Sequence, residues 1–253
     1  MILRKSDQLA HEVTRAIQRG DLDTIQRLLA DHPGLSGARI GDERGSGTVL
    51  HVVTDWPGFF PNGPAVVKLL IVNGADSNAR TEGAKSEQGE TPLQYAASSD
   101  DVEVAEALVL GGADIEARGG SIAGGTALEN AIGYGCWRVA RLLLNRGAKV
   151  EKLWHAAALG MTSTVEKFFQ ESPGPSREEV NHALWQGSRV GYRRTVEYLF
   201  ARGADLNWIP DYAKETPLQI ASSTGSDTGR EALVNWLREK VQGSATTVGK
   251  PKE

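Results

Sequence analysis

A two-part motif recurs along the chain and constrains its fold more than any other feature. The first part places a threonine before a small or proline residue, a leucine, a polar residue and small apolar residues. It occurs at Thr91–Ala97, Thr126–Ala131 and Thr216–Ala221, and in a shorter form at Thr48–His51. The second part is an apolar stretch with helical spacing that ends at Gly-Ala-Asp or a close variant, as in Val104–Asp114. Such self-similarity indicates a chain built from stacked copies of one unit.

Each part of the motif predicts one helix. Threonine can cap the free N–H groups at a helix start, proline is tolerated in the first turn, and alanine lets a neighbouring helix approach closely. The glycine after the apolar stretch supplies the left-handed backbone that closes a helix. The repeating unit is therefore expected to be an inner helix followed by an outer helix, with a turn leading to the next unit.

This pattern resembles the ankyrin-repeat family, whose unit of about 33 residues joins a turn to two helices and begins with a Thr-Pro-Leu-His-type sequence. The resemblance implies an all-α ankyrin-repeat solenoid of about seven helix-turn-helix repeats. One outer-helix position aligns through the chain as Leu28, Leu70, Leu108, Leu143, Phe168, Leu199 and Leu237. The repeats are expected over residues 6–40, 41–80, 81–118, 119–147, 148–173, 174–207 and 208–243. They make a single domain of residues 1–243, and the polar residues 244–253 are predicted to be a disordered tail.

Composition and charge argue against several classes of function. A net charge of −4 provides no basic field that would attract nucleic acid or an anionic membrane. No apolar run reaches the roughly 18 residues that cross a bilayer, and no apolar segment follows the N-terminal charges, so we expect a soluble cytoplasmic protein. The one cysteine, Cys136, can form neither an internal disulfide nor a cysteine-rich zinc site. No metal or cofactor is predicted.

Recognised catalytic motifs are also missing from the sequence. It contains no Gly-rich phosphate loop, no nucleophile elbow around a serine and no His-Glu-x-x-His metal helix. We therefore expect binding rather than catalysis. The ankyrin resemblance implies a protein or peptide partner, held on the concave groove and on the fingers, which are the turns that join one repeat to the next.

The inner helices predict where that partner binds. Residues three and four apart share one helical face, so equivalent positions of successive repeats should form a concave strip. These positions are unusually aromatic and ionisable, which is typical of binding surfaces. The predicted ligand-binding residues of the strip are His51, Asp55, Trp56, Tyr95, Asn130, Tyr134, Trp154, His155 and Trp185. Structural roles are alternatives for three of them: His51 could bond the neighbouring repeat's backbone, and Trp154 and His155 could fill space in a short repeat.

Three arginines recur at one phase and extend the predicted binding surface. Arg39, Arg80 and Arg118 each follow an alanine just after an outer helix, so stacking should align them as a ladder at the base of the fingers. Guanidinium groups in such a ladder suit a carboxylate or phosphate on a partner. The alternative is that they are ordinary solvated surface residues.

A second class of function stays open, namely a small-molecule binding or catalytic pocket for a small anionic or aromatic ligand. It would form where Trp56, Tyr134, Trp154 and His155 meet. An insert of roughly five residues at Pro57–Pro61 would place Phe59 and Phe60 either as a roof over that pocket or as a seal on the core. A closed pocket would indicate a small molecule, whereas a groove continuous across repeats would indicate a peptide.

Overall fold

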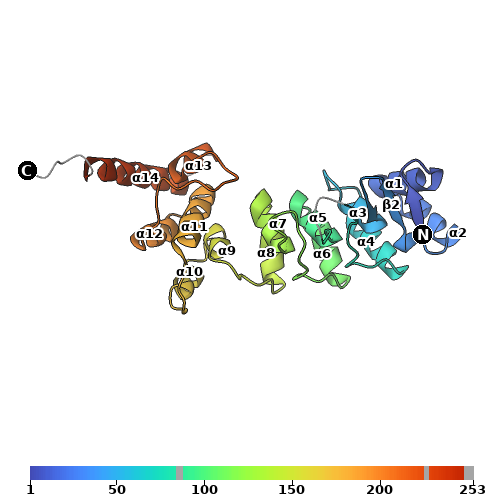
Figure 1. The fold of residues 1–253 in the computed structure, drawn as a ribbon. Helices are drawn as coiled ribbons and strands as arrows, with labels where there is room; N and C mark the ends of the chain where they lie inside the picture. The colour runs from blue at the N-terminus through green and yellow to red at the C-terminus, as the bar shows by residue number, and fades with distance from the viewer. Residues whose placement is uncertain (84–87, 225–227, 248–253) are drawn as a thin grey trace, which may run out of the picture. The chain divides into compact units, whose positions relative to one another are not determined.

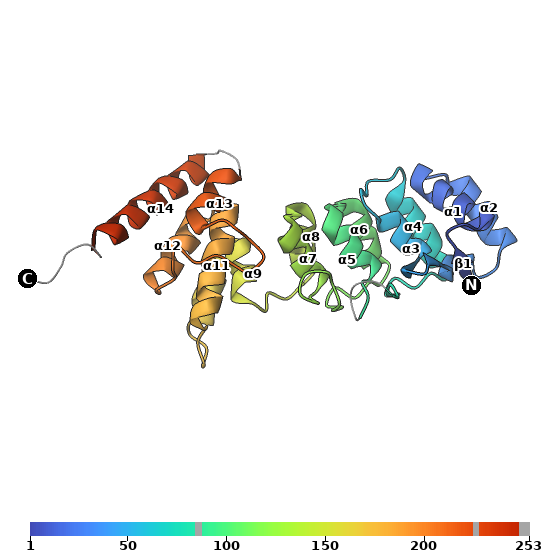
Figure 2. The same ribbon diagram turned by 45° about the horizontal axis from the view of Figure 1, so that its top comes forward.

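The computed structural model describes residues 1–83, 88–224 and 228–247. These residues form fourteen α-helices, one 3-10 helix and one small sheet. The chain divides into two compact units, Met1–Lys149 and Val150–Glu253, which are described separately below as unit 1 and unit 2. Figures 1 and 2 show that each unit is a row of helix pairs. A single repeat domain over residues 1–243 stays a prediction.

Unit 1 contains four helix pairs in its described residues. They are α1 (Gln8–Arg19) with α2 (Leu22–Asp31), α3 (Val49–Thr54) with α4 (Gly63–Val72), α5 (Pro92–Ser99) with α6 (Val102–Leu110), and α7 (Ala127–Tyr134) with α8 (Trp137–Asn145). The inner helices α1, α3, α5 and α7 pack on one another in chain order, and so do the outer helices α2, α4, α6 and α8. The 3-10 helix η1 (Leu35–Gly37) lies between the first two pairs in the sequence.

Unit 2 contains three further pairs. They are α9 (Leu153–Ala158) with α10 (Thr162–Phe168), α11 (Arg177–Val190) with α12 (Arg193–Ala201), and α13 (Pro217–Ser223) with α14 (Thr228–Thr247). The inner helices again pack in order, as do the outer ones. The predicted all-α fold of about seven helix pairs is confirmed.

The end of the chain differs in detail from the expectation. Helix α14 continues to Thr247, past residue 243, where the repeat domain was expected to end. A polar segment can extend a helix that is already nucleated, because each added residue costs little once the first turns exist. The rest of the predicted disordered tail, residues 248–253, lies outside the described residues.

One small sheet was not expected from the helical pattern. Strand β2 (Arg39–Asp42) pairs antiparallel with β3 (Gly45–Thr48), and β1 (Ile2–Arg4) pairs parallel with β2. The first finger is therefore a β-hairpin, joined on its outer side to the start of the chain. Ser46 also exchanges two backbone hydrogen bonds of 2.9 Å with Glu82 of the second finger. The first two fingers are thus held together by main-chain contacts.

The threonine of the repeated motif starts four inner helices as expected, a serine starts a fifth, and the polar residue three positions later completes each of these caps. Capping boxes of this kind begin α3, α5, α7, α11 and α13, at Thr48, Thr91, Thr126, Ser176 and Thr216. In the first three boxes the cap's backbone N–H donates to His51, Gln94 or Glu129 at 2.7–3.0 Å. Such a cap stabilises a protein by about 1 kcal/mol. The polar slot of the motif therefore has a structural function.

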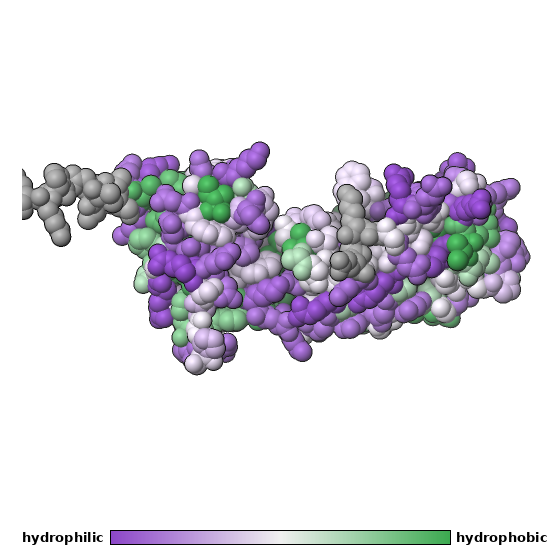
Figure 3. Space-filling view, in the orientation of Figure 1, coloured by the Kyte–Doolittle hydropathy of each residue, from purple (hydrophilic) through white to green (hydrophobic). Residues whose placement is uncertain are grey.

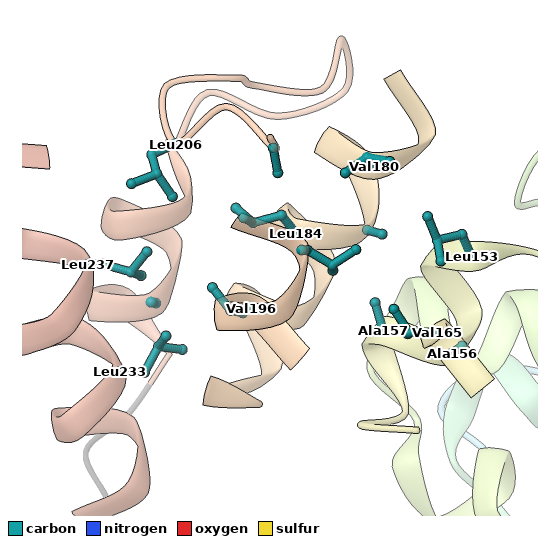
Figure 4. Packing of buried hydrophobic residues seen from close by; sticks show 14 residues of the cluster. Leu153, Ala156, Ala157, Val165, Val180, Leu184, Val196, Leu206, Leu233 and Leu237 are labelled. Atoms are coloured by element: carbon teal, nitrogen blue, oxygen red, sulfur yellow. The ribbon is translucent and has the colours of Figure 1, made fainter. Parts of the chain in front are cut away.

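The core lies between the two layers of helices in each unit. The aligned leucines of the outer helices are buried, whereas Phe168 packs at the edge of the core. Figure 4 shows the core of unit 2, where Leu184 and Val196 lie between Ala157 of α9 and Leu237 of α14. The visible surface of both units is mostly hydrophilic, with hydrophobic residues in separate small patches (Figure 3). Scattered apolar residues are ordinary on a protein surface.

Candidate functional site

The concave side of unit 1 carries a cavity of about 550 Å³, which we name the unit 1 groove. Helix α1 contributes its exposed face, including His11, Thr14, Arg15 and Gln18. The β2–β3 hairpin contributes Asp42 and Arg44 among others, α3 contributes His51 and Val52, and Asp55 follows α3. Tyr95 from α5 also lines it. The groove therefore draws its lining from three successive repeats.

Charges of both signs lie in the unit 1 groove. Asp42 accepts a hydrogen bond from Lys5 Nζ at 2.9 Å and another from Arg44 Nη2 at 3.4 Å. The Lys5 hydrogen bond is the main reason why the pKa of Asp42 falls to about 2, and the hydrogen bonds from Arg44 add to it. Arg15 and the exposed carboxylate of Asp55 add one charge of each sign.

Two of the predicted binding residues, His51 and Tyr95, form the wall of this groove. His51 is buried, its Nδ1 accepts from the Thr48 backbone N–H at 3.0 Å, and its Nε2 lies 2.9 Å from the Glu90 carbonyl. Since Nδ1 accepts, Nε2 carries the proton and donates to Glu90. Burial lowers the pKa of His51 to about 4. The ring contacts Tyr95 edge-on, with centroids 5.2 Å apart. These contacts favour the structural alternative for His51.

Asn130 likewise connects repeats inside unit 1. It is fully buried, and its Nδ2 lies within 3.2 Å of Glu90 Oε1 and the Gln94 carbonyl. Its Oδ1 accepts from the Ile122 backbone N–H at 3.2 Å. A side chain that is enclosed in this way has no surface to offer a partner, so its contacts favour a structural role.

The insert after α3 is anchored to the following repeat. The Phe59 backbone N–H donates to Asp101 Oδ2 at 2.7 Å, and Asp101 is the residue that caps α6. Neither Phe59 nor Phe60 lines the unit 1 groove. Trp56, just before the insert, is 82% exposed, and Tyr134 is 54% exposed at 3.2 Å from Ser121 Oγ. Both belong to unit 1, whereas Trp154 and His155 belong to unit 2.

The arginine ladder connects the fingers of unit 1 to one another. Arg39 Nη2 donates to the Arg80 carbonyl at 2.7 Å, and Arg80 Nη1 donates to the Arg118 carbonyl. Arg39 also contacts Ser46 Oγ at 3.1 Å and Glu82 at 3.2 Å. Arg39 and Arg80 thus bind the backbone of the next finger. A contact of the ladder with a partner's carboxylate or phosphate stays a prediction.

Unit 2 has a second cavity, of about 570 Å³, which we name the aromatic pocket. Trp154 of α9 and His182 of α11 line it, together with Trp208 and Tyr212 from the loop between α12 and α13. Of the predicted binding residues in unit 2, Trp154 reaches this pocket. His155 and Trp185 are buried; His155 contacts the Trp154 ring edge-on at 4.2 Å, and Trp185 Nε1 donates to the Glu215 carbonyl at 2.8 Å.

Sequence reasoning did not select His182, Trp208 or Tyr212. Helix α11 is longer than the other inner helices, so its capping serine precedes Trp185 by more than two turns and His182 falls one turn before the aligned position. The acidic start of α11 after Ser176, a capping-box signal, could have revealed this extra length. Trp208 and Tyr212 lie in a finger between α12 and α13. This segment is not helical, so helical spacing does not predict where their side chains point.

Comparison with known proteins agrees with this architecture. The family model described as ankyrin repeats in three copies matches residues 13–118 and 50–152, which together exceed half of the chain. The chain therefore belongs to the ankyrin-repeat family. The crystal structure of the human ASB11 ankyrin repeat domain is similar over 95% of this chain and 99% of its own, with a TM-score of 0.53 and 18% sequence identity. At that identity the likeness shows the fold alone. A comparison with curated proteins found no match.

Ankyrin repeats generally act as protein–protein interaction modules, because their stacked units present an extended concave surface. Within the described residues, no helix is long and apolar enough to cross a membrane. The same part of the chain contains no group of three or more His, Cys, Asp or Glu side chains placed to hold a metal ion.

Proposed function

We propose that the chain binds a segment of a partner protein, and that this segment lies in the unit 1 groove. The observation that carries the proposal is the continuity of the groove across three repeats, from α1 through the β2–β3 hairpin and α3 to Tyr95. A lining of that extent suits an extended peptide, whereas a small molecule is usually enclosed by a pocket of convergent groups.

The chemistry of the lining supports a peptide of mixed composition. Apolar atoms of Ala10, Ile40 and Val52 lie beside the charges of Arg15 and Asp55. A partner with both apolar and charged side chains could satisfy all of them, since protein interfaces combine apolar contact with a polar rim. In this proposal Asp55 and Tyr95 contact the partner, while His51 holds the wall behind them.

The cytoplasmic location and the role as a scaffold belong to the same proposal. The one cysteine, Cys136, is buried, and burial raises the pKa of its thiol. A protein without a possible internal disulfide suits a reducing compartment. A scaffold role would follow if the unit 1 groove and another surface of the chain bind different segments.

The proposal can be tested with peptides selected by display on the purified chain. We expect Tyr95→Ala and Asp55→Lys to weaken the selected peptides about tenfold or more, which corresponds to roughly 1.4 kcal/mol. Glu103→Lys is the matched control, because it makes the same charge change at an exposed site of α6 outside the groove. Thermal melts of all three variants check that the fold is intact. Peptides that bind the groove variants as tightly as the original chain would contradict the proposal.

A further inference from the structure

Four aromatic rings meet in the aromatic pocket of unit 2, and none of this pocket is used by the function proposed above. The His182 ring is central: its centroid lies 5.4 Å from that of Trp154 and 5.9 Å from those of Trp208 and Tyr212. All four rings line the cavity of about 570 Å³. The cavity therefore presents four aromatic rings, from two helices and one loop, among its lining side chains.

Buried residues hold two of these rings, His182 and Tyr212, in place. Tyr212 Oη lies 2.7 Å from His182 Nε2 and accepts from Gln186 Nε2 at 3.0 Å. Trp185, which is buried and contacts the Tyr212 ring edge-on, donates from Nε1 to the Glu215 carbonyl at 2.8 Å and so fixes the end of the loop. Because these contacts exist before any ligand arrives, binding would require little ordering of the pocket.

The charged side chains that line the cavity are mostly acidic, and the cation Arg189, which interacts with Tyr212, lies outside the lining. Glu178, Glu179 and Asp211 line the cavity, against one lining cation, Lys152. Hydrogen bonds from Ser176 lower the pKa of Glu179, so this carboxylate is ionised at neutral pH. Burial lowers the pKa of His182 to about 4, with a smaller contribution from His155, so the central ring is uncharged there. The rings and carboxylates therefore favour a positive ligand and disfavour an anion.

The chain itself shows that a cation can lie against these rings. Lys152 Nζ is 6.0 Å from the centroid of the Trp154 ring. Cations are attracted to the electron-rich faces of aromatic rings, tryptophan most strongly. A guanidinium or alkylated ammonium group gains more from such a site than a plain ammonium does, because it is more weakly hydrated and loses less on entering.

We propose that the aromatic pocket binds the cationic side chain of a partner protein, an arginine or a methylated lysine, with its charge against the tryptophan rings and near Asp211. The site is distinct from the unit 1 groove, and all of its described lining residues belong to unit 2. It supplies a second point of recognition whether or not the groove binds a peptide.

The test uses the full chain and short glycine-flanked peptides that carry one arginine or one trimethyllysine. Binding is followed through the indole N–H signals of the tryptophans in NMR titrations up to about 10 mM, since one side chain binds weakly. We expect saturable shifts of the Trp154 and Trp208 signals with at least one cationic peptide. Peptides with citrulline, or with the carbon isostere of trimethyllysine, should bind about tenfold more weakly.

The relative affinities of the two cationic peptides identify which cation the pocket prefers. Tighter arginine binding assigns the pocket to guanidinium groups, and tighter trimethyllysine binding assigns it to methylated lysine; both results support the proposal. Equal affinity for the charged peptides and their neutral isosteres would overturn it, because the pocket would then be merely apolar. Absence of any shift with both cationic peptides would also overturn it.

Variants locate the binding site without depending on a core residue. Asp211→Asn should weaken the preferred peptide by about threefold to tenfold, and Lys152→Gln should strengthen it by removing the competing cation. Both residues lie at the surface of the pocket, so the fold should be unchanged. The matched control is Glu171→Gln, at an exposed site outside the pocket lining, which should leave the affinity unchanged. Unchanged affinity in both pocket variants would overturn the proposal.

Discussion

The capping box of α3 predicts how acid affects the stability of unit 1. His51 closes this box, and burial lowers its pKa in the folded chain to about 4, against 6.5 for an ordinary histidine. At the same position in α5, Gln94 closes the box without a titratable group, as Gln219 does in α13. The substitution His51→Gln therefore removes the titratable group. Glutamine should still close the capping box of α3, because Gln94 closes the equivalent box in the next repeat.

The sign of the effect follows from the lowered pKa. Below about pH 6.5, His51 becomes protonated in the unfolded chain but stays neutral in the folded chain. The free energy of unfolding therefore falls as the pH drops toward 4. Above pH 6.5, His51 is neutral in both the folded and the unfolded chain, so it does not reduce the free energy of unfolding there. At pH 5 the two pKa values give a loss of about 2 kcal/mol relative to pH 7.5. His51→Gln should not show this loss.

Urea denaturation at pH 7.5 and pH 5, followed by far-UV circular dichroism, measures the difference. The pKa of His182 is also lowered to about 4, but His182 titrates equally in both chains and cancels in the comparison. Loss of the edge contact with Tyr95 adds a penalty of about 1 kcal/mol that is the same at both pH values. His11→Gln, at an exposed site in α1, controls for the substitution itself. Equal losses in the original chain and in His51→Gln would refute the reasoning.

Three further predictions concern packing, capping and the fingers. Leu108→Ala should cost about 2–5 kcal/mol in urea denaturation because Leu108 is fully buried in α6, which packs against both α4 and α8, and Leu237→Ala should cost less because, among the described helices, α14 packs against α12 and α13 at the end of unit 2; equal costs would contradict this. Thr91→Ala should lower the free energy of unfolding by about 1 kcal/mol through loss of its cap, whereas Thr91→Ser should restore most of it. Arg39→Lys keeps the charge, but lysine cannot donate to Ser46 and to the Arg80 carbonyl at the same time. The backbone amide of Glu82 should therefore exchange its hydrogen faster, while the melting temperature of the chain changes little. Unchanged exchange at Glu82 would argue against a role of Arg39 in holding the second finger.

Much of the fold could be predicted because its signals are local. A capping threonine, a leucine with helical spacing and a closing glycine each act within a few residues, and their order gave the seven helix pairs. The sheet could not be predicted in this way. Strand β3 consists largely of Gly45, Ser46 and Gly47, which have little intrinsic strand preference, and its pairing depends on Glu82 and on β2.

The candidate site was harder to predict because helical phase gives the face of a residue and not its environment. Asp55 and Tyr95 line the unit 1 groove as their phase suggested. Asn130 occupies the position in its repeat that Tyr95 occupies in the preceding one. Its side chain is nevertheless buried between repeats, where it donates hydrogen bonds to Glu90 and to the Gln94 carbonyl. Only the coordinates of the neighbouring repeat distinguish these cases. The aromatic pocket depends on a loop that folds back onto His182, which no periodic pattern encodes.

The arginine ladder has a consequence for how this surface can change. The Arg39 side chain donates a hydrogen bond to the carbonyl of Arg80, and the Arg80 side chain donates one to the carbonyl of Arg118. A main-chain oxygen is present whatever side chain stands beside it, so the attachment of one finger to the next does not depend on the sequence at the finger tips. Tip residues can therefore be randomised, lengthened or exchanged while the scaffold beneath keeps its register. A library built at the exposed turn of the first finger, at Glu43 and Arg44, could be screened for new binding specificities without redesigning the helices.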